Sequence, residues 1–136
     1  SEAHAAPDAP VLDARTAAVL PPAGLFAARA ELHPSARLFR FDWTVPSIWL
    51  SERGIEPAAD LAFEPREESL LIARPNLHVR ATRLNANAYV FLDACRRGQT
   101  LGQAAAEALR INPSTDLRTL FARLIEAGAF TRLRIP

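Results

Sequence analysis

The chain has 136 residues, of which 49% are hydrophobic and 23% charged, and its formal net charge is +1. This size and balance are typical of a folded domain with one moderate core, and they exclude a disordered or fibrous chain. A single cysteine excludes an internal disulfide. No apolar run reaches the roughly 18 residues of a membrane span, so we expect no membrane partner. No signal peptide is visible, and the expected compartment is therefore the cytoplasm.

The charge is divided unevenly along the chain. All 16 basic residues are arginine, and residues 1–69 hold 6 of them against 11 acids. Residues 70–136 hold the other 10 against only 4 acids. A basic half of a small domain predicts an anionic partner, either nucleic acid or an acidic peptide. The alternative is a solvated arginine surface that binds nothing.

Residues 1–30 are rich in alanine and proline. Four prolines exclude one continuous helix, because each lacks a donor and restricts the residue before it. They are Pro7, Pro10, Pro21 and Pro22. We expect a linker or packing arm here, with one short helix around residues 13–20. It resembles the tail of a missing N-terminal helical domain, which leaves residues 31–136 as a C-terminal α+β domain for peptide or partner binding.

From Leu38 the hydrophobic period becomes two, which predicts a strand that is buried on one side. The residues expected on the core face are Phe39, Phe41, Trp43 and Val45. Pro46 ends the strand because it cannot donate to a ladder, and residues 47–50 are expected to form a turn or a short helix. Residues 54–68 are acidic and interrupted by proline, and they predict a loop.

Residues 69–84 predict a β-hairpin. Pro75 and Asn76 stand between two β-rich runs, and proline presets φ at the second turn position while asparagine tolerates the next one. Polar and apolar residues alternate in the second run, so one face of this strand is expected to be polar and basic. The polar positions are His78, Arg80 and Thr82, and the apolar ones are Leu77, Val79 and Ala81.

Three helices and a strand follow. Asn85 caps the first helix, which Gly98 ends, and Thr100 with Gln103 forms a capping box for the second. Asn112 and Pro113 are expected to open the third, which ends at Gly128 before a strand over residues 129–135. The residues expected to face inward are Ala88, Phe91, Leu92, Cys95, Leu101, Ala104, Ala105, Ala108, Leu109, Leu117, Leu120, Phe121, Leu124 and Ile125. The whole predicts an α+β fold, a small antiparallel sheet with a three-helix winged-helix-like module.

The sequence offers no catalytic constellation. His4, His33 and His78 lie far apart and lack the spacing of metal ligands. Cys95 lies on the apolar stripe of a helix, which is typical of a buried structural cysteine rather than a nucleophile. The five glycines form no phosphate-binding loop. We therefore expect no enzyme activity, no cofactor and no metal site.

Two binding functions remain. In the first, peptide binding, an exposed strand edge supplies backbone hydrogen bonds and the arginine-rich hairpin attracts an acidic peptide. The candidate peptide-binding or partner-binding residues are Arg74, His78, Arg80, Arg83, Arg132 and Arg134. The competing reading is that these arginines only protect a sheet edge from aggregation.

The alternative function is a DNA-binding transcriptional regulator that uses the winged-helix-like module. The third helix would supply Arg118 and Arg123, and the last strand would supply Arg132 and Arg134 as a wing. The two helical arginines are five residues apart and do not share one stripe. The helix also holds few Asn, Gln or Ser residues to contact base edges.

Three segments resemble, in their order, the C-terminal domain of the HvfC/BufC-type peptide-modification chaperones. They are LHPSARLFRFDWTVPSIW at 32–49, ESLLIARPNLHVRATRLNANAYVFLDACRRGQTLGQAAA at 68–106, and LRTLFARLIEAGAF at 117–130. The resemblance covers residues 31–135. It rests most on the Leu32–Ser35 opening, the Phe41–Trp43 strand and the Arg83–Leu84 entry to the first helix.

The resemblance implies a non-catalytic partner in the biosynthesis of ribosomally made peptides. Members of the family are paired with a TIM-barrel multinuclear-iron enzyme that modifies cysteines of a precursor peptide, often in copper-related pathways. The chaperone helps to present the leader peptide, and the iron belongs to the enzyme. This chain departs from the family because the N-terminal helical domain is absent. That domain was once catalogued as DNA-binding, and residues 1–6 look like the end of its last helix, so the chain is expected to be a fragment or a reduced homologue.

Overall fold

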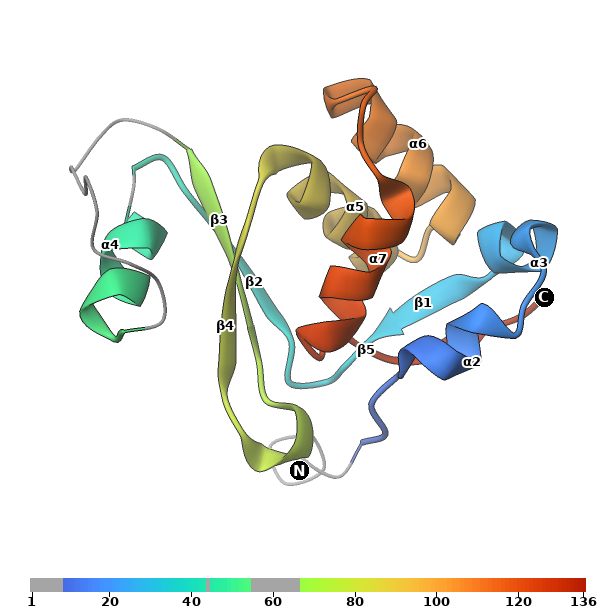
Figure 1. Cartoon of the computed structure of the whole chain (residues 1–136), viewed down its shortest axis with the longest axis horizontal. Coiled ribbons are helices and arrows are strands. Elements are labelled where there is room, and N and C mark those ends of the chain that lie inside the picture. The colour runs from blue at the N-terminus through green and yellow to red at the C-terminus, as the bar shows by residue number, and fades with distance from the viewer. Residues whose placement is uncertain (1–8, 44, 55–66) are drawn as a thin grey trace.

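The computed structural model describes residues 9–43, 45–54 and 67–136, which form an α+β fold (Figure 1). The helices are α2 (Ala14–Ala18), α3 (Pro22–Ala27), α4 (Val45–Glu52), α5 (Ala86–Arg96), α6 (Leu101–Ile111) and α7 (Leu117–Glu126). The strands are β1 (Arg29–Leu32), β2 (Arg37–Phe41), β3 (Glu68–Ala73), β4 (Arg80–Leu84) and β5 (Phe130–Arg134). Most of the loop expected over residues 54–68 lies outside the described residues. Within the described part of the chain, no helix is long and apolar enough to cross a membrane.

The strands form two small antiparallel sheets rather than one. β2, β3 and β4 make a three-stranded sheet in that order, and β1 pairs with β5 in the other. In the first sheet Ala73 pairs with Arg80, and in the second Ala30 pairs with Leu133. The predicted hairpin and the predicted last strand are therefore both confirmed. β4 begins at Arg80, because the chain from Pro75 to Leu77 forms a 3₁₀ turn first.

Residues 9–29 contain two short helices and pack against the rest of the fold. α2 lies within the predicted helix, and α3 begins at Pro22, where proline is tolerated because the first helical N–H needs no partner. Leu12, Ala17 and Ala30 are buried in the same core as the three later helices. Whether this segment is the tail of an upstream domain stays a prediction.

The three later helices begin and end at residues with clear capping chemistry. The Asn85 side chain accepts the backbone N–H of Ala88, and Thr100 and Gln103 form the expected capping box. The predicted start of the third helix at Asn112 is wrong. Asn112 ends α6 and turns its side-chain oxygen to the N–H of Ser114, so the side chain of Asp116 accepts the Thr119 N–H and caps α7 instead.

One hydrophobic core joins the helices to both sheets. Of the residues expected to face inward, Phe91, Leu92, Cys95, Leu101, Ala104, Ala105, Ala108, Leu120, Leu124 and Ile125 are buried, while Ala88, Leu109, Leu117 and Phe121 are half-buried. Leu71 of β3 and Phe130 of β5 belong to the same core. In Figure 1, α4 lies on one side of the three-stranded sheet and helices α5 to α7 lie on the other.

The predicted core face of β2 is wrong. Phe39 is 42% exposed and Trp43 is 43% exposed, while Phe41 is only half-buried. The neighbour on the opposite face, Leu38, packs against the core. The outer face that holds the aromatic rings is covered only in part, because α4 packs mainly against β3 and β4 rather than against β2. Val45, which we expected in this strand, is the first residue of α4.

Candidate peptide-binding groove

β4 is an edge strand that borders a groove. β3 pairs with one side of β4, and within the described residues no strand pairs with the other side. The groove has a volume of about 970 Å³ and is lined by β4, the start of α5, the turn before α7 and one side of α7. An unpaired strand edge beside a groove offers backbone donors and acceptors together with room for a ligand.

Three arginines stand along this groove. Arg80 and Arg83 come from β4 and Arg123 from α7, and all three are exposed. The Arg80 guanidinium donates a hydrogen bond to the carbonyl oxygen of Glu126, the last residue of α7. A cation at a helix C-terminus is favourable, because the last carbonyls of a helix carry partial negative charge. This contact fixes the position of β4 relative to α7.

The groove also contains Asp116, but its carboxylate is already used. Oδ1 accepts the backbone N–H of Thr119 at 3.2 Å, and Oδ2 accepts the Thr119 hydroxyl at 2.9 Å. The backbone hydrogen bond from Thr119 is the main cause that lowers the pKa of Asp116, so this residue stays ionised as the cap of α7. The groove is lined by three arginines, Arg80, Arg83 and Arg123, and by two acids, Asp116 and Glu126, so its formal charge is +1.

Buried polar contacts hold the turn before α7. Asn87 of α5 is buried, and its Nδ2 donates to Oγ1 of Thr115 at 2.8 Å. The Thr115 hydroxyl in turn donates to the carbonyl oxygen of Asn112 at 2.6 Å. A buried polar side chain with a satisfied partner gives a rigid wall. The groove is thus built on fixed elements at this end.

The six residues predicted for binding do not form one surface. Only Arg80 and Arg83 line the groove. Arg74 and His78 are exposed at the closed end of the hairpin, where the backbone N–H of Arg74 donates to Oγ of Ser35 at 2.7 Å. Arg132 and Arg134 lie on β5 in the other sheet, with their Nε atoms 3.9 Å and 3.8 Å from the Glu31 carboxylate.

Sequence reasoning did not place Asn87, Thr115 and Asp116 in the site. Asn87 carried a signal, because it is a polar residue among apolar ones in a helix, and a buried amide needs a partner. Arg123 was noticed only as a DNA-contacting candidate. It lines the groove, while Arg118, five residues earlier, borders an apolar pocket beside α2 and α3. The two arginines of α7 therefore lie at different sites.

The chemistry of Cys95 and of the possible metal ligands can be judged from the described residues. Cys95 is buried, and burial raises the pKa of its thiol to about 12, which keeps it protonated. Within the described ranges, no three His, Cys, Asp or Glu side chains come together as a metal site. The exposed edge of β4 and its groove are features that a peptide ligand could use.

Comparison with known proteins gives no assignment. No family model matches the chain, and no curated protein matches it. The resemblance to the peptide-modification chaperones thus stays a prediction.

Proposed function

We propose that this domain is a non-catalytic partner that binds an extended segment of a ribosomal precursor peptide. The observation that carries the proposal is the unpaired edge of β4 beside a groove walled by α7. A peptide that adds to β4 as a further strand would pair its backbone N–H and C=O groups with those on the free edge of β4. Its alternate side chains would then point into the groove. Binding of this kind needs no catalytic group.

The charges of the groove favour an acidic peptide. Arg80, Arg83 and Arg123 border the space that the peptide would fill. Charge-assisted hydrogen bonds from guanidinium groups to carboxylates are short and strong, and they hold a peptide in one register. Backbone pairing supplies most of the affinity in this scheme, and the arginines select the sequence.

The partner enzyme is the second part of the proposal. By its resemblance to the chaperones, the domain would deliver the leader peptide in the cytoplasm to a TIM-barrel multinuclear-iron enzyme, and the iron would belong to that enzyme. A peptide held as a strand on β4 leaves the residues outside the groove free for the enzyme to modify. Delivery and chemistry are then divided between two proteins.

A titration tests the proposal. A precursor leader peptide is added to the 136-residue chain, and binding is measured by calorimetry and by amide hydrogen exchange. We expect micromolar or tighter binding and slower exchange at β4. Arg123→Glu should weaken binding at least about tenfold, because it removes one charge-assisted contact and adds a repulsive charge. Arg110→Glu makes the same charge change on an exposed residue of α6 outside the groove, and it should bind like wild type.

Two outcomes would contradict the peptide proposal. The first is a leader that does not bind or does not protect β4, provided that the protein is folded. The second is sequence-specific DNA binding that survives competitor DNA and weakens steeply with salt, as expected for a transcriptional regulator.

A further inference from the structure

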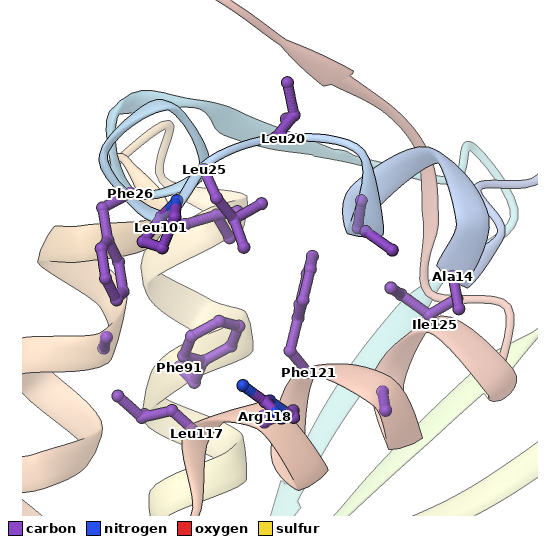
Figure 2. Close-up of a pocket in the computed structure, with 15 residues that line it drawn as sticks. Ala14, Leu20, Leu25, Phe26, Phe91, Leu101, Leu117, Arg118, Phe121 and Ile125 are labelled. Carbon is purple, nitrogen blue, oxygen red and sulfur yellow. The ribbon is translucent and has the colours of Figure 1, made fainter.

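A second cavity lies on the other side of α7 from the peptide groove. It has a volume of about 630 Å³ and lies between α2 and α3 on one side and α5, α6 and α7 on the other (Figure 2). Fourteen of its fifteen lining residues are alanine, leucine, isoleucine, proline or phenylalanine. In Figure 2, Leu25 and Phe121 point into this space from opposite walls. This size and lining are typical of a small-molecule pocket.

The outer wall is a strap, residues 13–27, that is anchored at both ends. Before it, the backbone N–H of Leu12 donates to the carbonyl oxygen of Phe130 at 3.0 Å. After it, the Ala28 carbonyl oxygen accepts the Leu101 N–H at 2.8 Å. α3 also lies close to α6, because a Cβ on Gly102 would approach the Phe26 carbonyl oxygen to 3.1 Å. The strap therefore forms one wall of the cavity.

Arg118 is the single charged residue that lines the cavity. Its side chain is exposed, and within the described residues its guanidinium has no hydrogen bond or ion pair with another side chain. Asp116 is close enough to interact with Arg118 electrostatically, but both of its carboxylate oxygens bind Thr119. An apolar cavity with one cationic group at its rim is complementary to an apolar chain that ends in an anion.

The geometry points to a binding site for a medium-chain fatty acid in this cavity, with the hydrocarbon tail under the strap and the carboxylate on Arg118. A partner helix fits less well, because a helix with its side chains is about 10–12 Å across and the strap closes one wall. The site is separate from the peptide groove and does not depend on the proposed function. Its ligand would contact α7 on the side away from Arg123.

Calorimetric titration with decanoate, below its micelle concentration, tests the inference on the 136-residue chain. We expect one decanoate per chain, with affinity rising about fourfold per methylene from octanoate to dodecanoate. Decanol should bind about tenfold more weakly than decanoate, because it cannot form the charge-assisted hydrogen bond. In Arg118→Gln this preference should disappear while decanol binding persists. Arg110→Gln should keep the preference, since Arg110 lies outside the cavity.

A second pair of variants tests the position of the tail. Ala122 is an exposed residue of α7 that lines the cavity, and Ala106 is an exposed residue of α6 that does not. Ala122→Phe should abolish decanoate binding without lowering the melting temperature, and Ala106→Phe should bind normally. Equal binding by both variants would overturn the inference. The inference would also be overturned if the wild-type chain did not bind decanoate, whether it bound anionic lipid vesicles, amphipathic helical peptides or neither.

Discussion

Gly98 and Gly128 occupy equivalent positions, each one residue after the C-cap of a helix. Both have positive φ, 86° at Gly98 and 77° at Gly128, which is the left-handed conformation that favours glycine after a helix. Their surroundings differ. A Cβ at Gly98 would meet nothing within 4 Å, whereas at Gly128 it would lie 2.3 Å from Cγ of Pro75. Pro75 belongs to the turn of the hairpin, so α7 and the hairpin touch at this point.

The pair separates backbone strain from steric contact. Gly98→Ala should lower the free energy of unfolding by about 1 kcal/mol, the cost of a left-handed alanine. Gly128→Ala should cost about 3 kcal/mol or more, because the new methyl group also overlaps the Pro75 ring. Urea denaturation at neutral pH measures both. If both variants lost the same free energy of unfolding, the hairpin would not press on Gly128. Adding Pro75→Ala to Gly128→Ala should restore part of the lost free energy, because it removes the ring that the new methyl group overlaps.

Cys95 predicts a pH dependence of stability. Its thiol ionises near pH 9.0 in an unfolded chain, and burial raises the pKa to about 12 in the fold. Between these values the unfolded chain loses the proton and the folded chain keeps it. The contribution of the protonated Cys95 thiol to the free energy of unfolding is therefore complete below about pH 9. It is lost as pH rises towards 12, by about 1.4 kcal/mol per pH unit.

The measurement compares wild type with Cys95→Ala by urea denaturation from pH 7 to pH 10.5. The stability advantage of wild type should stay constant up to about pH 9 and shrink by about 2 kcal/mol at pH 10.5. Iodoacetamide should label the wild-type thiol only at the rate of unfolding. A constant difference across the range, or rapid labelling of the folded protein, would show that the thiol is accessible.

At the scale of elements, the sequence predicted best those features whose cause is local. The turn between β3 and β4 follows from Pro75 and Asn76, and Asn76 indeed has φ of 53° and ψ of 33°. The start of α6 follows from the Thr100 capping box. In each case neighbouring side chains supply much of the physical reason, although Leu77 in the same turn also has a positive φ of 70°, which its own side chain does not favour.

Elements whose cause is distant were missed. β1 is four residues long and follows a proline-rich segment, so it has no pattern of its own, and it exists because β5 pairs with it. The face of β2 was misassigned because alternation shows that a strand has two faces but not which one the core covers. The start of α7 was misplaced because both Asn112 and Asp116 can accept a backbone N–H, and only the geometry of the turn decides between them.

In the candidate site too, the residues with a local cause were predicted and those brought in by distant packing were missed. Arg80 and Arg83 were predicted because they lie on the hairpin that the local pattern revealed. Arg123 and Asn87 join them only because α5 and α7 pack beside β4, and that approach depends on the whole core. The apolar cavity was not predicted at all, since half of its wall is the strap that the sequence suggested only as an arm or linker.

At the scale of the whole molecule, the turn from β1 to β2 joins the two sheets through His33. This residue is only 1% exposed, and its Nδ1 accepts the backbone N–H of Ser35 at 3.1 Å. The backbone N–H of His33 donates to the carbonyl oxygen of Ala129, just before β5. The Ser35 hydroxyl oxygen accepts the N–H of Arg74 at the end of β3. One short turn therefore holds β5, the sheet junction and the hairpin together.

This connection predicts that the described chain unfolds as one unit, since both sheets also share a single core. Tryptophan fluorescence reports on Trp43 and Trp49, beside the three-stranded sheet, and far-ultraviolet circular dichroism reports mainly on the helices. The two urea transitions should superimpose.

His33→Ala should shift both midpoints together and lower the free energy of unfolding by about 2 kcal/mol, because it opens a cavity and removes the acceptor of the Ser35 N–H. His78→Ala, at an exposed histidine, should change stability by no more than about 0.5 kcal/mol. Two separate transitions in wild type would mean that the sheets fold independently, and two that separate only in His33→Ala would mean that this turn alone couples them.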